Sequence, residues 1–558
     1  MPRRAGGYPA GVTDLILGPL LRFASATEAT IWVETDGPCE VEVLGRSEPT
    51  FGVAGHYYAL VRIEGLEPGG TYEYEVRLDG ERRWPEPGTE LPPSVIQAFA
   101  PGRSLDVCFG SCRVAAPHEE PYTLTQDESE DGFEVDALHA LARQMVDDDR
   151  EEWPELLFLL GDQVYVDEAS PWARERIRER RSTAPAPGEE VLDYEEYTFL
   201  YRESWGDPLL RWLLSTVSTS MVWDDHDMSD DWNISRSWHE EMEAKEWWHE
   251  RAIAGIVSYW VYQHLGNLSP RELDENELYA KVRGNPDATA ILREWAHGIG
   301  GTAAGVRWSF CRDLDGVRAI FMDSRAARVL TRERRSMFDD EVWDWLVEHV
   351  EGDFDHLLIA TTVPFLLSPA FDRLEAWNER LCDGAWGGPV AWASEKLRRA
   401  VDFDHWASFQ FSFQRLRRLL EEVGSGGRGK APATIAVLSG DVHHAYLAEI
   451  GFRPEAGVRS AVVQVVCSPY RNPLSSREQR VVRAAFRRPF TAVARGLARL
   501  AGAPAPGLGW RTVEGPYFDN QVATLHLEGR RASVRLDKTV AGEEDERRLE
   551  KSFERRLA

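Results

Sequence analysis

The feature that constrains this chain most is an uninterrupted apolar run at residues 156–160, which stops abruptly at Gly161-Asp162. A run of this length is typical of a strand that is buried on both faces, as in a parallel sheet. Asp162 would then lie at the carboxyl end of the strand, where open α/β sheets bind their ligands. Tyr165 follows three residues later, so a carboxylate and a phenol could bind one hard cation. A surface Asp that caps the next helix is the alternative.

Two other apolar runs end in the same kinds of side chain. Residues 219–223 lead into Asp224-Asp225-His226-Asp227, and residues 434–438 lead into Ser439-Gly440-Asp441-Val442-His443-His444. Carboxylates and imidazoles are common metal ligands, and three strand ends that all carry them are hard to explain as solvated loops. We therefore expect these strand ends to form a metal centre.

Five motifs resemble those of the PhoD-like (alkaline phosphatase D) metallophosphatases and follow the order of that family: Cys108-Phe109-Gly110-Ser111-Cys112-Arg113, Gly161-Asp162-Gln163-Val164-Tyr165, Trp223-Asp224-Asp225-His226-Asp227, Phe321-Met322-Asp323-Ser324-Arg325 and Ser439-Gly440-Asp441-Val442-His443-His444. Five ordered matches are far more specific than any single short motif. The resemblance implies an α/β fold, the four-layer αββα metallophosphatase sandwich. It also implies hydrolysis of phosphate esters by a hydroxide that two metal ions activate.

The resemblance implies a centre with Fe³⁺ and Ca²⁺, for which the metal ligands would be Cys112, Asp162, Tyr165, Asp225, Asp441 and His443. Asp162 is the expected bridge, because one carboxylate can bind two cations. Cys112, Tyr165 and His443 would complete the ferric site, since thiolate and phenolate stabilise the higher oxidation state. Asp225 and Asp441 would hold calcium, and oxygen ligands favour calcium or magnesium over zinc. Mg²⁺, Mn²⁺ and Zn²⁺ are the alternatives to these two ions.

Three further side chains are candidates for catalysis. His226 follows a metal-ligating Asp, so we expect it to face the leaving-group oxygen as a general acid or to stabilise charge in the transition state. Arg325 and Arg113 are candidate phosphate clamps, because a guanidinium can bind two phosphoryl oxygens; either could instead form a structural ion pair. Asn233 is the nearest candidate for the asparagine that the family has after this motif, although Asp230-Asp231 intervenes.

Two other functions would be compatible with these motifs. One is a phospholipase-like phosphodiesterase on the same fold, which would share the metal ligands and differ in the insertions over the site. The other is a metal-binding protein without catalysis, which would need a broken position in one of the motifs. No motif position is visibly broken, which counts against the second.

The length of 558 residues predicts two or more domains. Residues 1–100 alternate between apolar and polar positions with Gly-Pro and Gly-Gly turns, which predicts a small all-β sandwich similar to fibronectin type III. The catalytic domain would then span 101–540, and a charged tail with a helix from Glu543 would span 541–558. We expect helical insertions in the catalytic domain at 166–215, 235–300 and 475–510.

The formal net charge of −29 argues against a nucleic-acid partner and predicts that a phosphate site depends on locally fixed cations. We expect a monomer that acts on a small-molecule phosphate ester. The six scattered cysteines are typical of a reducing compartment, which favours a cytoplasmic protein. Arg3-Arg4 before the apolar residues 15–21 could belong to an export signal, but Asp14 and Pro19 interrupt it, so we interpret this segment as strands. No apolar run is long enough to span a membrane.

Residues 477–500 combine many arginines with Val, Ala, Phe and Leu. A basic amphipathic helix of this kind can lie on an anionic membrane surface. The alternative, which we favour at this point, is a cationic helix docked on the strongly acidic protein itself.

Overall fold

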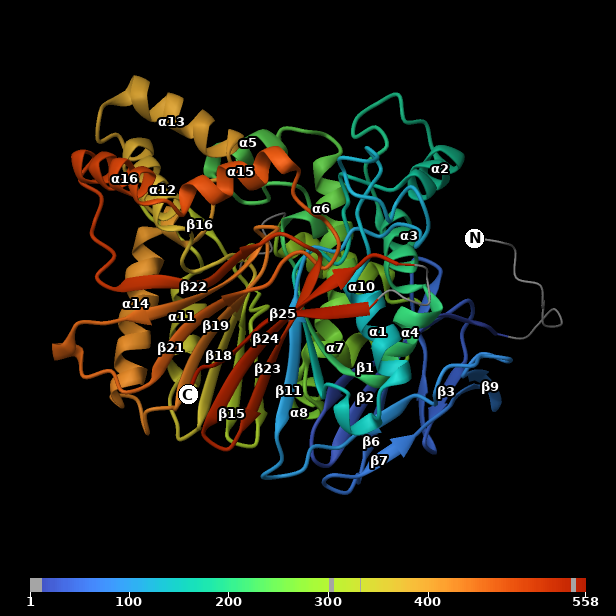
Figure 1. Cartoon of the computed structure of the whole chain (residues 1–558). Coiled ribbons are helices and arrows are strands. Elements are labelled where there is room, and N and C mark those ends of the chain that lie inside the picture. The colour runs from blue at the N-terminus through green and yellow to red at the C-terminus, as the bar shows by residue number, and fades with distance from the viewer. Residues whose placement is uncertain (1–12, 301–305, 332, 543–547) are drawn as a thin grey trace.

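The computed structural model describes residues 13–300, 306–331, 333–542 and 548–558. Two large β-sheets pack face to face at its centre (Figure 1). In the first sheet, three parallel strands, β13 (Ser218–Val222), β12 (Leu156–Leu160) and β11 (Leu105–Gly110), are followed by three antiparallel strands, β23 (Gln521–Glu528), β24 (Arg531–Val540) and β25 (Arg548–Arg556). The apolar run 156–160 is thus a central strand, buried along its whole length.

The second sheet has seven strands in the order β14 (Phe310–Leu314), β15 (Val317–Met322), β18 (His356–Thr361), β19 (Thr434–Ser439), β21 (Ala461–Val466), β20 (Ala445–Gly451) and β22 (Gly509–Tyr517). The four strands from β15 to β21 are parallel. Side chains from the two sheets meet in the middle, as the rings of Phe158 and Phe321 do with centroids 4.7 Å apart.

Helices cover the outer face of each sheet. The second sheet buries Leu357 and Ile359 against α11 (Asp340–His349) and α14 (Gln410–Ser425). The first sheet is covered by α1 (Ala137–Asp147), which packs on β23, β24 and β25 (Figure 1). These layers confirm the predicted αββα sandwich.

The predicted N-terminal β-rich domain is also present. One of its sheets pairs β1 (Leu15–Ala24), β2 (Glu28–Thr35), β6 (His56–Glu64) and β5 (Phe51–Val53). The other pairs β4 (Arg46–Pro49), β3 (Glu40–Val43), β8 (Val76–Leu78) and β9 (Glu81–Trp84), and a short ladder joins β7 (Thr71–Glu73) to β10 (Val95–Gln97). The two larger sheets enclose a hydrophobic core of their own.

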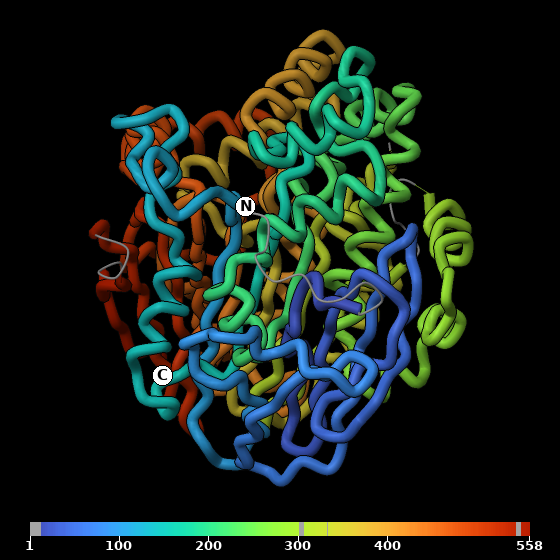
Figure 2. Tube along the Cα trace, turned by 90° about the vertical axis from the view of Figure 1, so that its right-hand side faces the viewer, coloured from blue at the N-terminus to red at the C-terminus, as the bar shows by residue number. Residues whose placement is uncertain are grey.

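The N-terminal domain, blue in Figure 2, is joined to the catalytic domain through η3 (Tyr259–His264), a buried π-helical segment. Arg22 donates to the carbonyl oxygens of Tyr262 and Gln263, both at 2.7 Å, and the indole of Trp32 donates to Val261 O at 3.0 Å. Buried carbonyl groups need hydrogen-bond donors, and here the donors come from the other domain. The β-sandwich therefore completes the hydrogen bonding of a catalytic-domain helix.

Most insertions consist of helices. Residues 166–215 contain α2 (Pro171–Arg180), α3 (Tyr194–Trp205) and most of α4 (Pro208–Thr216), and residues 235–300 contain α5 (Arg236–Glu243), α6 (Trp248–Ser258), η3, α7 (Leu265–Asn267), α8 (Pro270–Glu275), α9 (Glu277–Val282) and α10 (Thr289–Gly298). Residues 475–510 contain α15 (Ser476–Ala485) and α16 (Arg488–Leu500). None of the helices in the described part of the chain is both long enough and apolar enough to cross a bilayer.

The prediction of a helix from Glu543 onward is wrong for residues 548–556. Residues 548–556 form β25, which pairs antiparallel with β24, and Phe553 lies opposite Leu536 and is buried. The Glu, Lys and Arg residues of this segment favour a helix, but pairing with an otherwise open sheet edge determines its structure.

Candidate metal centre

The carboxyl ends of four strands, β11, β12, β13 and β19, converge on one point between the two sheets. The backbone N–H of Cys112, after β11, donates to Gly161 O, after β12, at 3.4 Å. Asp441, after β19, donates its N–H to the Ser111 hydroxyl at 2.9 Å. A Cβ added to Gly161 would lie 2.7 Å from the Cβ of Asp224, after β13, so only glycine allows this approach. Three of the predicted motifs, together with Ser111-Cys112 of a fourth, therefore meet at one site.

The backbone is strained at this site. Four of the predicted ligands have a positive φ, namely Cys112 at 59°, Asp162 at 50°, Asp441 at 68° and His443 at 49°. The left-handed region is unfavourable for residues with a Cβ, and such residues cluster at functional sites where the surrounding structure holds them. The positive φ values therefore fall on the residues that the sequence predicts as ligands.

Three buried carboxylates form the centre of the cluster. Asp162, Asp224 and Asp225 each offer an oxygen atom, and these atoms lie within 4.8 Å of one another. Asp162 Oδ1 and Asp224 Oδ2 are buried without a hydrogen-bond partner. Burial raises the pKa of Asp162 well above its usual value; His226 opposes this shift, whereas Asp225 and Asp441 add to it. Because unpaired carboxylate oxygens are costly in a buried site, this donor set fits a cation.

The other predicted ligands border this cluster. Burial, and after it the negative charge of Asp162, raises the pKa of the Cys112 thiol and of the Tyr165 phenol well above their usual values. Burial lowers the pKa of His443 to about 4. His443 is therefore neutral at pH 7, the form in which imidazole binds a metal.

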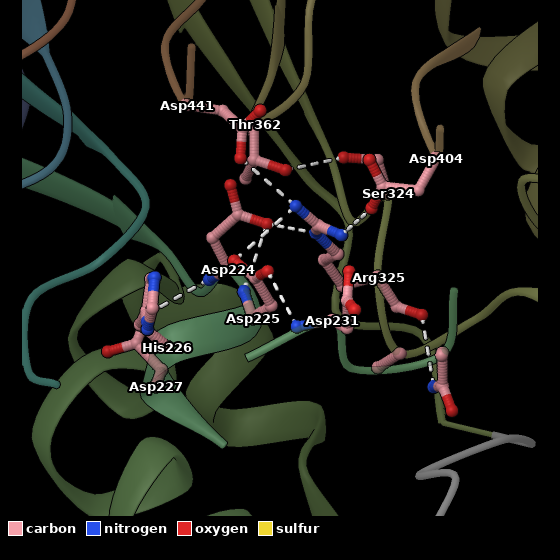
Figure 3. Close-up of polar contacts among 12 residues, drawn as sticks. Asp224, Asp225, His226, Asp227, Asp231, Ser324, Arg325, Thr362, Asp404 and Asp441 are labelled. Atoms are coloured by element: carbon pink, nitrogen blue, oxygen red, sulfur yellow. Dashed lines mark hydrogen bonds and ion pairs between the residues drawn. The ribbon is translucent and has the colours of Figure 1, made fainter. Parts of the chain in front are cut away.

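Arg325, a predicted phosphate clamp, lies among carboxylates (Figure 3). Its guanidinium forms ion pairs with Asp224 and Asp404, and it contacts Asp441 at 3.0 Å and Asp225 at 3.4 Å. Burial alone would lower the pKa of Arg325, but these carboxylates raise it well above its usual value. Arg325 is thus a fixed positive charge beside the three-carboxylate cluster.

His405 is a member of the site that the sequence analysis missed. Its Nε2 lies 3.1 Å from Asp441 Oδ2 and its Nδ1 2.7 Å from Glu375 Oε1, on α12 (Pro369–Cys382). Burial raises the pKa of Asp441, and the His405 hydrogen bond and Arg325 more than reverse this, so that the pKa lies below its usual value. The sequence Asp402-Phe403-Asp404-His405 has the residue types of the other motifs, but it follows a helix, so a search for strand ends does not find it.

His226 lies beside the carboxylate cluster and is held by a carboxylate outside it. Its Nδ1 lies 3.1 Å from Asp167 Oδ1, and its ring lies against that of Tyr165 with centroids 4.5 Å apart. Asp167 was also missed; it lines a pocket of about 640 Å³ together with Asp230 and Asp231. Burial lowers the pKa of His226, but the hydrogen bond with Asp167 and the nearby carboxylates raise it well above its usual value. His226 is therefore positively charged at neutral pH.

Two residues predicted for the site, Arg113 and Asn233, form hydrogen bonds with protein groups that the sequence analysis did not name. Arg113 lies 2.7 Å from Asp136, the N-cap of α1, and donates to Ser204 O at 2.7 Å, which is the structural ion pair that we named as the alternative. Asn233 is buried with a φ of 59°; its amide donates to Arg325 O at 3.2 Å, and its Oδ1 has no hydrogen-bond partner.

Asp227 fixes the loop that carries Asp224 through two hydrogen bonds. Asp227 Oδ2 accepts from Asp224 N at 2.9 Å, and Asp227 Oδ1 accepts from the Gln263 amide of η3 at 3.1 Å. The π-helical segment that the N-terminal domain caps thus also positions a loop of the site.

Comparison with known proteins identifies the family of this chain. The profile of the PhoD-like phosphatase family matches residues 132–495, more than half of the chain, and residues 12–96 match a domain of unknown function, DUF7800. A solved structure of PhoD, 12% identical, superposes with a TM-score of 0.58 over 99% of this chain and 94% of that one. The purple acid phosphatase PPD1 from yellow lupin (Lupinus luteus) seeds is 10% identical, with a TM-score of 0.45 over 96% and 73% of the two chains. No curated protein matches the sequence. The chain belongs to the PhoD-like phosphatase family.

Proposed function

We propose that this phosphatase hydrolyses small-molecule phosphate esters with the help of two cations. The observation that carries the proposal is the convergence of Asp162, Asp224 and Asp225, two of which keep a buried oxygen without a partner. Family membership supports a metal-dependent phosphoesterase.

Asp162, Cys112, Tyr165 and His443 would hold one ion, and Asp225 and Asp441, with Asp224 added from the structure, the other. Thiolate and phenolate suit Fe³⁺ in the first position, and an all-carboxylate set suits Ca²⁺ in the second. Mg²⁺, Mn²⁺ and Zn²⁺ are the alternatives. When bound, such ions supply Lewis acidity toward the phosphoryl group and its attacking water.

The chain itself would supply the proton for the leaving group. His226 Nδ1 is fixed by Asp167. Nε2 lies 3.9 Å from the exposed Asp230 carboxylate, beyond hydrogen-bond distance, so it would donate to an ester oxygen. Since Asp167 lines the pocket of about 640 Å³, we assign that pocket to the alcohol part of the substrate. A positioned acid of this kind contributes about 10²–10⁴-fold to the rate.

Arg325 would balance the charge of the site. In a chain with a net charge of −29, an anionic substrate gains nothing from long-range attraction. A buried guanidinium beside Asp224 and Asp441 reduces the local negative charge that a phosphoryl group meets. We therefore expect Arg325 to act on the phosphoryl group together with the cations.

The test is metal analysis of the purified protein together with rates on nitrophenyl phosphate and bis-nitrophenyl phosphate. We expect hydrolysis that a chelator abolishes and added metal restores, and the ratio of the two rates decides between monoester and diester. Asp162→Asn should abolish both metal binding and hydrolysis. Asp344→Asn, an exposed carboxylate on α11, is the matched control and should change neither. Metal-loaded protein that hydrolyses neither ester, or an Asp162→Asn variant with full activity, would contradict the proposal.

A further inference from the structure

The helix α16 is docked on the protein through small side chains. Thr491, Ala494 and Ala498 form its buried face, and Ala494 packs with Ala370 of α12 and Ala485 of α15. The helix of the 475–510 insertion therefore does lie on the protein, as the favoured interpretation of the sequence expected. Phe371 and Leu374 of α12 pack against these small residues, so the buried contact is apolar.

A second face of α16 is apolar and uncovered. The side chains of Phe490, Val493 and Leu500 are 55%, 64% and 74% exposed. Leu497 lies between them and is half-buried. Spacings of three, four and three residues place these four side chains on one flank of a helix. Three large apolar side chains on one flank make a continuous exposed patch rather than scattered surface residues.

The opposite flank of α16 and the surface of α15 are basic. Seven arginines lie between residues 476 and 500, all of them exposed, whereas Glu478 is the only acidic residue of that segment. On α16, Arg488, Arg495 and Arg499 recur at helical spacing on the flank away from Phe490. In the part of the chain that the structure describes, none of the seven forms an ion pair; Arg480 and Arg483 donate to Ser476 O and Gln479 Oε1. The Arg483 guanidinium also lies over the Phe518 ring at 4.5 Å, and the charge of Arg495 opposes the rise that burial causes in the pKa of Asp372.

We propose that α15 and α16 form a docking surface for an anionic lipid bilayer. This surface leaves its cations unpaired in a protein whose net charge is −29, so its complement is an external anion. A soluble polyanion would pair with the arginines and leave the apolar flank in water. A helix that lies in the plane of a bilayer buries such a flank at the acyl boundary, while its arginines reach the lipid phosphates.

The neighbouring helix α13 (Gly388–Ala400) adds interfacial aromatic residues. Trp392 is 64% exposed and Trp386, just before the helix, 43%. Both α13 and α16 pack on α12, and with α15 they gather at one end of the molecule (Figure 1). Tryptophan is enriched where proteins meet the headgroup region, so these side chains extend the same docking end.

The experiment is cosedimentation of the full-length protein with vesicles of phosphatidylcholine, with and without 30% phosphatidylglycerol. We expect binding only to the anionic vesicles and weaker binding at high salt. Each arginine near such a surface contributes about fivefold to the partition coefficient, so Arg488→Glu, Arg495→Glu and Arg499→Glu together should reduce it by about 100-fold or more. Phe490→Ser with Val493→Ser should weaken it by at least about tenfold.

Two matched variants serve as controls: Arg271→Glu, whose side chain is 86% exposed on α8, and Leu44→Ser, 40% exposed in the N-terminal domain. Both should bind like the unchanged protein, and all variants should keep its unfolding temperature. Absence of binding to anionic vesicles, or equal binding of the triple Arg variant, would overturn the proposal. So would self-association that the triple variant loses, because that would identify a contact between copies. The measurement needs no turnover, so its outcome is independent of the phosphatase assay.

Discussion

The hydrogen bond between His226 and Asp167 allows a test of the proposal that His226 protonates the leaving group. Asp167→Asn keeps the shape of the side chain but replaces the charge 3.1 Å from His226 Nδ1 with a neutral amide. If His226 protonates the leaving group, the variant should keep both metals and lose rate. The loss should be larger for an alkyl phosphate than for a nitrophenyl phosphate, because an alkoxide needs a proton more than a nitrophenolate does.

The size of the loss follows from the burial of this pair. The side chains of His226 and Asp167 are 17% and 13% exposed, and a hydrogen bond to a charged group of this kind contributes about 1.5–3 kcal/mol. At about 1.4 kcal/mol per factor of ten, Asp167→Asn should slow alkyl ester hydrolysis by about 10- to 100-fold. His226→Ala removes the acid altogether and should cost about 10²–10⁴-fold.

The assay measures metal content and the rates on one aryl and one alkyl phosphate for each variant. Asp225→Ala is the contrasting variant, because loss of a ligand should remove metal and activity together, and excess calcium should partly restore both. A His226→Ala protein that lacks a metal would show that His226 is a ligand. Equal losses of His226→Ala on the two esters would refute protonation of the leaving group.

Three further predictions concern stability, backbone space and metal identity. Burial lowers the pKa of His56, but its hydrogen bonds with Glu195 and Glu34 raise it to about 8. The stability from the charged imidazole is therefore complete below about pH 6.5 and lost as the pH rises through 8, so the cost of His56→Ala in urea unfolding should be about 2 kcal/mol larger at pH 6 than at pH 9. Gly161→Ala should lose metal and activity, because its Cβ would lie 2.7 Å from Asp224 at a φ of 121°, whereas Gly188→Ala, at a φ of 74° with no atom within 4 Å, should keep both. Tyr165→Phe should remove a visible charge-transfer band of the ferric protein without changing its far-UV circular dichroism; a colourless protein that is fully active with zinc alone would contradict iron at this position.

The strand ends could be predicted from the sequence because parallel strands bring their carboxyl ends to one edge of a sheet. This rule locates Asp162, Asp225 and Asp441, since each follows an apolar run. It does not locate His405, which follows a helix and reaches the site only through tertiary packing. The rule also does not predict that Arg325 forms ion pairs with carboxylates, because the sequence does not indicate which charged side chains lie next to a buried guanidinium.

The strand β25 shows the other limit of sequence reasoning. Its residues 548–556 have the charged composition of an exposed helix. Whether they form a helix or a strand depends on the open edge that β24 offers, which is a property of the assembled sheet.

The hydrogen bonds of Arg22 and Trp32 with η3 make the catalytic domain depend on the N-terminal β-sandwich. Removal of residues 1–100 would take three hydrogen-bond donors away from the carbonyl oxygens of η3 and expose this segment to water, at a net cost of about 0.5–1.5 kcal/mol for each lost hydrogen bond. The same helix segment holds Asp227, so the loss would extend to the loop that carries Asp224. Gene fusion or truncation at that boundary therefore cannot exchange the N-terminal region as an independent module. A chain that carried a different N-terminal domain would have to supply equivalent donors to η3.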